Sequence, residues 1–252
     1  MSNKTRLDVL LTERGLAESR QKAQAVIMAG HVFVAGQRVD KPGTAVLSDA
    51  PIEVRGHALP YVSRGGLKLE KAMKTFPITL TDKICADIGA STGGFTDCML
   101  QNGARKVYSV DVGYGQLDWK LRSDPRVVCM ERTNARYLTP EQIPDPLDFA
   151  SIDVSFISLT YVIPVIARIA APGASVVLLV KPQFEVGKGN LGKGGIVEDR
   201  HLRDQALETV VDCANQHGLT VAGTAPSPIE GTHGNTEFLL FARMDDIAAK
   251  AD

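Results

Sequence analysis

The stretch Ile84-Cys85-Ala86-Asp87-Ile88-Gly89-Ala90-Ser91-Thr92-Gly93-Gly94-Phe95 decides the fold of this 252-residue chain. A short apolar run reaches an acid, a glycine-rich turn follows, and the next residues can start a helix. This order is typical of a parallel strand that passes into a helix whose N-terminus faces a ligand. We therefore expect an α/β protein in which this strand begins the sheet.

Four further apolar runs follow, each of a length typical of a buried strand. They are residues 106–110, 127–130, 149–152 and 174–180. A helix at about 199–217 and two more strands, at 220–223 and 236–242, complete the alternation. This alternation predicts a Rossmann-like, doubly wound, mostly parallel sheet.

Charged residues directly follow these runs, and three of them are Asp111, Asp153 and Lys181. The ligand crevice of a doubly wound sheet lies at the carboxyl ends of its strands. We therefore expect these three side chains to meet the glycine turn at one site.

Residues 6 to about 55 predict a separate small α+β module. Leu7, Leu10 and Leu11 have helical spacing, and Ser19 can cap a second helix that Gly30 would end. Short strands are expected at 31–34, 38–39 and 52–54. The expected domains are this module at 1–60, a linker and first helix at 61–81, and the large domain at 82–252.

The charge of the chain is unevenly distributed, although its net value is only −1. Up to Lys74 there are 12 Lys and Arg residues against 7 Asp and Glu, whereas the remainder has 16 against 22. A basic first third indicates a local site for a polyanion, and a solvated lysine-rich face is the competing explanation. The candidate phosphate-binding residues are Arg6, Arg14, Arg20, Lys22 and Lys41 in the small module, Arg64 in the connector, and Lys188 and Lys193 in a glycine-rich loop.

The four cysteines, Cys85, Cys98, Cys129 and Cys213, form no C-x-x-C pair and have no histidine at metal-ligand spacing. We therefore expect free thiols in a reducing compartment, and no metal site. The most apolar region, residues 149–180, is interrupted by charged residues and by Pro172-Gly173, so it is not expected to span a membrane. These features indicate a cytoplasmic protein without a membrane partner.

The glycine turn partly matches three ligand-binding motifs that imply different chemistry. As the dinucleotide fingerprint G-x-G-x-x-G, it has Ser91 in place of the glycine that lets a pyrophosphate approach the backbone. As the nucleophile elbow G-x-S-x-G, it would make Ser91 a nucleophile, with Asp153 and His233 in the required chain order. That elbow follows several earlier strands of its sheet, whereas this turn follows the first strand, so a hydrolase is disfavoured.

The third match is a turn that binds S-adenosylmethionine. This ligand has no pyrophosphate, so a serine in the turn is acceptable. Asp111 follows about twenty residues later, where an acid would bind ribose hydroxyls. The candidate cofactor-binding residues are Asp87, Gly89, Ser91, Thr92, Gly93, Gly94, Phe95 and Asp111, with Asn134 as a candidate contact to the adenine.

Many positions of the small module share the pattern of one RNA-binding domain. They are Arg6-Leu7-Asp8, Leu11, Gly15, Ser19-Arg20, Ala23, Ile27, Gly30-His31-Val32, Val34, Gly36, Val39 and Lys41-Pro42. With this pattern the module resembles the alpha-L RNA-binding domain, first described in a ribosomal protein of the small subunit. The resemblance implies binding to structured RNA through the two helices, and A-form RNA is recognised largely through phosphate and shape contacts.

Three segments at strand ends resemble those of the FtsJ-like ribose methyltransferases. They are residues 87–95, Ser151-Ile-Asp-Val-Ser-Phe156 and Val180-Lys-Pro-Gln-Phe184. Together with the alpha-L module and the segment Ser63-Arg-Gly-Gly-Leu-Lys68, they make the chain resemble the TlyA family. The resemblance implies S-adenosylmethionine-dependent 2′-O-methylation of cytidine ribose in ribosomal RNA, with ribosomal subunits as partners. It also implies a catalytic tetrad, which falls on Lys68, Asp153, Lys181 and Glu237.

The chemistry of methyl transfer to a ribose explains the need for such a tetrad. A hydroxyl is a poor nucleophile, so it must be held about 3 Å from the methyl group and relieved of its proton. Lys181 is the candidate base or hydroxyl orienter, and it could be neutral only if burial, Lys68 and the sulfonium outweighed the two carboxylates. We expect Asp153 to orient Lys181, and Lys68 and Glu237 to fix the target ribose.

Two other classes of function stay open at this stage. A non-catalytic RNA-binding or ribosome-assembly factor could retain the donor fold, although the complete tetrad argues against it. A hemolysin-like membrane-active protein is suggested only by a name used within the family, and the sequence has no strongly amphipathic basic helix. An alpha-L domain also occurs in pseudouridine synthases, whose chemistry does not fit the glycine turn.

Overall fold

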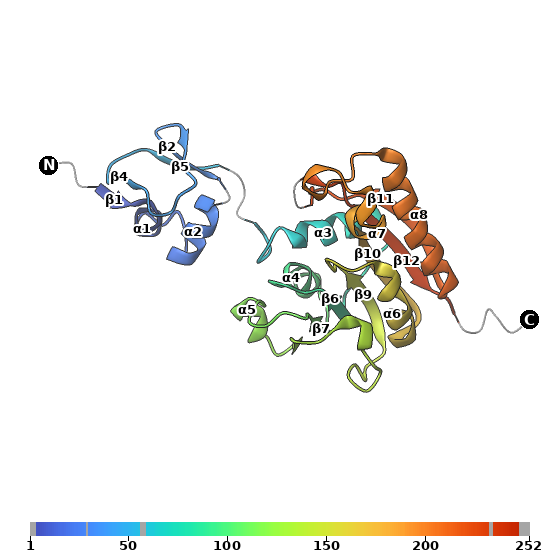
Figure 1. Ribbon diagram of the computed structural model, residues 1–252. Helices are drawn as coiled ribbons and strands as arrows, with labels where there is room; N and C mark the ends of the chain where they lie inside the picture. The colour runs from blue at the N-terminus through green and yellow to red at the C-terminus, as the bar shows by residue number, and fades with distance from the viewer. Residues whose placement is uncertain (1–3, 29, 56–58, 232–233, 247–252) are drawn as a thin grey trace, which may run out of the picture. The chain divides into compact units, whose positions relative to one another are not determined.

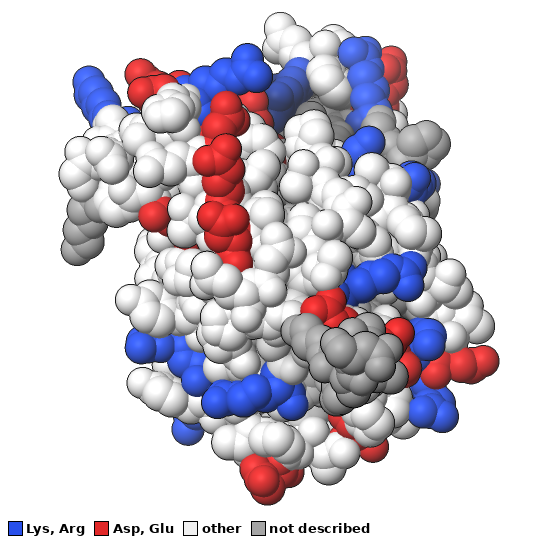
Figure 2. All heavy atoms as spheres, turned by 90° about the vertical axis from the view of Figure 1, so that its right-hand side faces the viewer, with Lys and Arg blue, Asp and Glu red and all other residues white. Residues whose placement is uncertain are grey.

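The computed structural model describes residues 4–28, 30–55, 59–231 and 234–246 (Figure 1). The chain divides into two compact units, Met1–Pro60 and Tyr61–Asp252. Residues 61–81, expected as a linker and first helix, belong to the same unit as the large sheet. On the face that Figure 2 turns to the viewer, basic and acidic side chains are interspersed among uncharged ones.

The small unit combines two helices with short antiparallel strands. Its helices are α1 (Leu7–Glu13) and α2 (Arg20–Met28). Strands β2 (Val32–Val34), β3 (Gln37–Arg38) and β5 (Ile52–Val54) form one sheet in the order β3-β2-β5, while β1 (Lys4–Arg6) pairs with β4 (Ala45–Leu47). The pairing of β1 with β4 was not predicted, because neither strand alternates clearly between polar and apolar residues.

The two helices of the small unit begin and end near the predicted signals. Ser19 accepts a hydrogen bond at Oγ from the backbone N–H of Lys22 at 3.2 Å, as a helix cap does. Gly15 and Gly30 have φ values of 68° and 74°, which glycine adopts without steric cost just after a helix. The leucines of α1 pack against Ile27 of α2, so the predicted inner face of α1 is buried.

Seven strands of the large unit form one sheet in the order β11-β12-β10-β9-β6-β7-β8. Five of them pair in parallel: β6 (Ile84–Ile88), β7 (Lys106–Val110), β8 (Val127–Met130), β9 (Leu147–Ile152) and β10 (Ala170–Val180). Strand β12 (Phe238–Met244) runs antiparallel to both β10 and β11 (Leu219–Pro226). The predicted α/β fold with a mostly parallel, doubly wound sheet is confirmed.

Helices cover both faces of this sheet (Figure 1). On one face lie α3 (Gly65–Thr75) and α4 (Gly94–Gln101), which contribute Leu69 and Met99 to the core. On the other face lie α6 (Ile163–Ile169) and α8 (Arg200–Gln216), which contribute Ile166 and Val210. The strand of the glycine turn is therefore buried on both faces, which explains why its sequence is continuously apolar up to Asp87.

Several local features of the large unit differ from the sequence-based expectation. Helix α5 (Trp119–Arg122) was not predicted, because four residues carry no periodic signal. Helix α6 was not predicted either, since periodicity cannot separate a short buried helix from a strand within a continuous apolar run. Strand β10 begins at Ala170, so the expected turn at Pro172-Gly173 lies inside it, where its register with β9 shifts.

The described part of the chain contains no helix that is both long and apolar enough to cross a bilayer. The same residues contain no group of three or more His, Cys, Asp or Glu side chains placed to hold a metal ion. All four cysteines are free thiols. His233, which a hydrolase would need as its base, lies outside the described residues.

Candidate active site

Asp87, near the end of β6, holds the glycine turn in place through buried hydrogen bonds. Its Oδ2 accepts hydrogen bonds from the backbone N–H and the hydroxyl of Thr96, at 2.9 and 2.7 Å, and its Oδ1 accepts one from Ser151 at 3.3 Å. Because the side chain is fully buried, desolvation raises the pKa of Asp87 to about 6. Asp87 therefore ties β6 to the first turn of α4 and to β9.

The glycines of the turn allow two close approaches of the backbone. At Gly89, where φ is 88°, a Cβ would lie 2.2 Å from the backbone oxygen of Asp153. At Gly94 a Cβ would lie 2.3 Å from Ser63 Oγ and 2.8 Å from the backbone nitrogen of Gly66. The turn thus packs directly against the end of β9 and the start of α3, and side chains at these two positions would push them apart.

The remaining predicted cofactor residues of the turn fall into two groups. Ser91 and Thr92 are exposed at the carboxyl end of β6, whereas Gly93, Gly94 and Phe95 are buried. The ring of Phe95 packs into the core with Leu69 and Met99. A ligand at the turn would therefore meet Phe95 through its backbone.

Asp111 and Asn134 follow the next two strands of the sheet. Asp111 Oδ2 accepts a hydrogen bond from the backbone N–H of Ser91 at 2.8 Å, and its Oδ1 accepts one from Gly113 at 2.7 Å. This carboxylate joins the glycine turn to the loop after β7. Asn134 Oδ1 accepts a hydrogen bond from the N–H of Arg136 at 3.1 Å, so it caps a short turn, and its contact with an adenine stays a prediction.

The four residues of the predicted tetrad come together as two ion pairs. Lys68 Nζ, from α3, lies 2.6 Å from Oε2 of Glu237, just before β12. Lys181 Nζ, at the end of β10, lies 2.6 Å from Oδ1 of Asp153, at the end of β9. The exposed side-chain fractions are 13%, 3%, 10% and 19% for Lys68, Glu237, Lys181 and Asp153. Four segments that are far apart in the sequence thus place charges at the carboxyl edge of the sheet.

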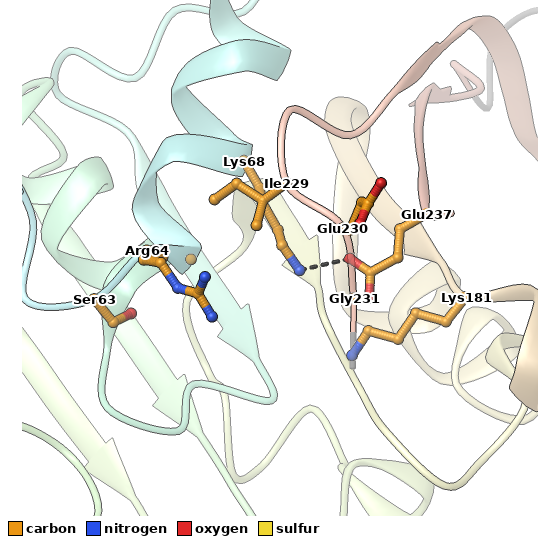
Figure 3. A pocket seen from close by; sticks show the side chains of 9 residues that line it. Ser63, Arg64, Lys68, Lys181, Ile229, Glu230, Gly231 and Glu237 are labelled. Carbon is orange, nitrogen blue, oxygen red and sulfur yellow. Dashed lines mark hydrogen bonds and ion pairs between the residues drawn. The ribbon is translucent and has the colours of Figure 1, made fainter. Parts of the chain in front are cut away.

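A pocket of about 550 Å³ opens onto three members of the tetrad. Figure 3 shows the side chains of Lys68, Lys181 and Glu237 converging on the same space. The other lining residues are Ser63, Arg64, Gly65, Ile229, Glu230 and Gly231. The pocket therefore offers two ammonium groups, a guanidinium and two carboxylates to a polar substrate.

Lys181 makes two contacts of different kinds. It donates a hydrogen bond to Ser155 Oγ at 2.9 Å. With Asp153 Oδ1 it forms an ion pair at 2.6 Å, and that oxygen accepts no hydrogen bond within the described residues. Asp153 and Ser155 together fix where the Lys181 nitrogen lies.

Comparison with known proteins identifies the family to which this arrangement belongs. Residues 61–244 match the family model described as FtsJ-like methyltransferase, and residues 5–52 match the S4 domain model. The chain belongs to the FtsJ-like methyltransferase family. The S4 domain is the alpha-L RNA-binding domain that the small module resembles, so the unit Met1–Pro60 is called the S4 unit below. Both resemblances, to this domain and to the FtsJ-like methyltransferases, are confirmed.

Similar proteins extend over nearly the whole chain. It is 55% identical, over 95% of its length and 85% of the relative's, to a Bacillus subtilis protein named "Putative rRNA methyltransferase YqxC". It is 47% identical, over 96% of its length and 91% of the relative's, to "16S/23S rRNA (cytidine-2'-O)-methyltransferase TlyA" of Mycobacterium tuberculosis. A solved structure titled "Putative hemolysin from Streptococcus thermophilus" has a TM-score of 0.77 and 49% identity, and the match covers 98% of this chain and 90% of that one.

Ser155 and Gly231, which lie next to members of the tetrad, were not singled out from the sequence. Ser155 was quoted within a motif but given no role, although it follows Asp153 by two positions and binds Lys181. At Gly231 a Cβ would lie 2.3 Å from Oε1 of Glu237, so a side chain there would displace that carboxylate. The sequence could have indicated Ser155, because a short polar residue close to a strand-end acid is a recognisable pattern. No feature of the sequence indicated Gly231.

The FtsJ-like unit also positions part of the predicted basic loop. Asn235 Oδ1 accepts a hydrogen bond from the N–H of Val197 at 3.1 Å, and its Nδ2 donates one to the carbonyl of Gly195 at 3.1 Å. These bonds tie the loop that contains exposed Lys193 to the segment leading to Glu237. The side chain of Lys188 lies outside the described residues.

The predicted phosphate-binding residues of the S4 unit have different surroundings. Arg6 and Arg20 both bind the carboxylate of Asp8. Arg14 donates hydrogen bonds to the backbone carbonyls of Ala50, at 2.7 Å, and Ser48. Two further members of the set are exposed: Lys22, which is paired with Glu18, and Lys41.

Proposed function

We propose that this protein transfers a methyl group from S-adenosylmethionine to the 2′-hydroxyl of cytidine in ribosomal RNA. The observation that carries the proposal is the convergence of Lys68, Lys181 and Glu237 on one pocket, with Asp153 behind Lys181. The pocket lies at the carboxyl edge of a doubly wound sheet, where such folds bind their ligands. The named activity of the Mycobacterium tuberculosis relative supports this reaction and the cytidine target.

The residues of the glycine turn and its neighbours fit this methyl donor. The turn exposes Ser91 and Thr92 beside glycines that allow close approach, as the amino acid part of the donor needs. Each carboxylate oxygen has two acceptor positions, so Asp111 can accept from ribose hydroxyls while it holds Ser91 and Gly113. When bound, S-adenosylmethionine supplies a methyl group activated by the sulfonium charge.

The two lysines and the two carboxylates act on the target ribose in this proposal. Lys181 binds the 2′-oxygen, either as an amine that removes the proton or as an ammonium that orients the oxygen, and Asp153 lies 2.6 Å from its nitrogen. Lys68 and Glu237 hold the ribose through its remaining polar groups. Holding the nucleophile in line with the methyl group supplies much of the rate enhancement in reactions of this kind.

The RNA substrate accounts for the small N-terminal unit, Met1–Pro60. The presence of an S4 unit and a methyltransferase unit in the same chain supports ribosomal RNA, and ribosomal subunits, as the partner. Arg64 lies in the pocket wall and is exposed, so it can bind a phosphate next to the target nucleotide. A protein that acts on ribosomes is expected in the cytoplasm.

The test is methyl incorporation into ribosomal subunits from cells that lack this protein. Purified protein and S-adenosylmethionine with a labelled methyl group are expected to label the RNA, and nuclease digestion is expected to release 2′-O-methylcytidine. Lys181→Ala is expected to lower the rate by a factor of about 10² to 10⁴. Lys71→Ala, an exposed lysine on the same helix as Lys68, is the matched control and is expected to retain the wild-type rate.

Three results would argue against the proposal. Label on a base instead of a ribose would exclude 2′-O-methylation. A wild-type rate for Lys181→Ala would remove that residue from the mechanism. Tight binding of subunits by the wild-type protein without any methyl incorporation would favour a non-catalytic assembly factor.

A further inference from the structure

Asp8, in the first turn of α1, is a buried carboxylate surrounded by nitrogen donors. Its Oδ1 accepts hydrogen bonds from Arg6 Nε and the backbone N–H of Val9, both at 3.0 Å. Its Oδ2 accepts from Arg6 Nη2 at 3.0 Å, Arg20 Nε at 3.0 Å and Gln24 Nε2 at 2.8 Å. These bonds, above all those from Arg6, hold the pKa of Asp8 well below its usual range.

The two arginines bound to Asp8 keep donors directed to solvent. Their side chains are 50% and 56% exposed for Arg6 and Arg20, whereas that of Asp8 is 0% exposed. Within the described residues, Nη1 of Arg6 and the two terminal nitrogens of Arg20 make no hydrogen bond. Arg6 Nη2 and Arg20 Nε are at most about 6 Å apart, because each lies 3.0 Å from the same oxygen. The carboxylate thus fixes two outward-facing guanidinium groups side by side.

A surface that attracted RNA through charge alone would gain nothing from a buried carboxylate between two arginines, since Asp8 cancels part of their charge. Its effect on the arginines is to order them. A free arginine side chain loses conformational entropy when it binds a phosphate, and a side chain already held in place loses less. Gly43 leaves space for the guanidinium of Arg6 in this position, because a Cβ at Gly43 would lie only 3.1 Å from Arg6 Nη1.

We propose that Asp8 is a positioning residue that holds Arg6 and Arg20 as a preformed clamp for RNA phosphates. The clamp deepens the proposed function and rests on it, since it assigns to the S4 unit the geometry with which it holds ribosomal RNA. Phosphate is the chemical group recognised, because the planar fork of arginine matches its oxygens.

Asp8→Asn in the full chain separates positioning from charge. The substitution makes the surface more positive by one unit, so a charge-only surface would bind RNA more tightly. The clamp predicts the opposite: affinity for purified ribosomal subunits falls at least about tenfold, and the slope of log affinity against log salt becomes shallower by about 1 to 2 as phosphate contacts are lost. Asp49→Asn, an exposed acid of the same unit, is the charge-matched control and is expected to bind at least as tightly as wild type.

Arg20→Lys keeps the charge and avoids a change in the buried carboxylate, so it remains informative if Asp8→Asn fails to fold. A lysine cannot bind Asp8 and present two further donors in a plane. We expect weaker binding by about tenfold, together with a raised KM for subunits and an unchanged kcat in the methylation assay. A purely structural role of Asp8 would not produce this split between KM and kcat.

The two proposals fail in different ways. If wild-type protein does not bind or methylate ribosomal subunits, the proposed function fails. If wild type binds, and Arg20→Lys and folded Asp8→Asn bind as tightly as wild type and Asp49→Asn, the clamp is refuted while the function stands.

Discussion

Lys68 Nζ lies 2.6 Å from Oε2 of Glu237, although 169 residues separate them in the chain. The pair connects α3, the first helix of the methyltransferase unit, with the segment that leads into its last strand, β12. Removing one partner of a buried pair leaves an uncompensated charge, which costs about 3–5 kcal/mol. We therefore expect Lys68→Met to lower the free energy of unfolding by about 3 kcal/mol, as measured by urea unfolding.

The double variant Lys68→Met/Glu237→Gln separates the role of this pair in stability from its role in activity. It removes both charges, so we expect it to be more stable than Lys68→Met alone. Methyl transfer is expected to be lost in the single and double variants alike, because both remove groups that face the pocket. Activity restored in the double variant would show that the pair serves stability only.

Ser155 gives a prediction about how precisely Lys181 must be held. Ser155→Ala removes the hydrogen bond to Lys181 Nζ and leaves the ion pair with Asp153 in place. A hydrogen bond to a charged group contributes about 1.5–3 kcal/mol, so we expect kcat to fall about tenfold or more while KM changes little. Ser155→Thr, which keeps the hydroxyl, is the control and should recover most of the rate. An equal loss in both variants would assign the effect to packing.

The cysteines give a prediction about reactivity. Burial raises the pKa of Cys85 and of Cys98 to about 12, and it also raises those of the half-buried Cys129 and Cys213. The thiolate is the reactive form, so a disulfide reagent at pH 8 should leave Cys85 and Cys98 unmodified until urea unfolds the protein. Slow reaction in the native state is expected at Cys129 and Cys213, and Cys129→Ser/Cys213→Ser should abolish it.

Asp87 gives a prediction about stability and pH. Its folded-state pKa of about 6 is above the ordinary value of 3.8, so the folded protein binds more protons than the unfolded chain between these values. The free energy of unfolding attributable to Asp87 therefore falls as pH rises from about 4 to 6. Asp87→Asn should remove this slope and be more stable than wild type at pH 8, by up to about 3 kcal/mol.

Urea unfolding at intervals from pH 4 to pH 8 measures this slope. Asp212→Asn, an exposed acid on α8, is the control and is expected to keep the wild-type pH dependence. If Asp87→Asn kept the wild-type slope, the Asp87 carboxyl of the wild-type protein would titrate in the folded state as it does in the unfolded chain.

Much of the fold, but only part of the site, followed from local sequence. The strand ends at Asp111, Asp153 and Lys181 were predictable because parallel strands place their carboxyl ends at one edge. Lys68 and Glu237 followed only from the family resemblance, since nothing local connects a lysine on α3 with an acid before β12. The inward position of the Phe95 ring and the room that Gly231 leaves for Glu237 depend on tertiary contacts alone.

The arginines of the S4 unit illustrate the same limit. Their charge and spacing predicted a phosphate-binding surface, but nothing in the pattern Arg6-Leu7-Asp8 shows that the acid is buried and the arginine half-exposed. Burial of Asp8 depends on α2, which brings Arg20 and Gln24 to it from twelve and sixteen residues further along the chain. The sequence therefore predicted the two arginines as binding groups but did not indicate the carboxylate that holds them.

Asp111 can act on the methyl donor in two ways. Its two oxygens hold the glycine turn and the loop after β7, and they can also bind the ribose hydroxyls of the donor directly. Asp111→Ala is expected to weaken binding of S-adenosylmethionine by about 1–3 kcal/mol, measured by calorimetry, through lost charge-assisted hydrogen bonds. A second ligand separates direct binding from loop positioning: S-adenosylhomocysteine and its 2′,3′-dideoxy analogue differ only in the ribose hydroxyls. If Asp111 binds those hydroxyls, wild type should prefer the natural ligand and Asp111→Ala should lose that preference. An equal preference in both proteins would limit Asp111 to holding the turn.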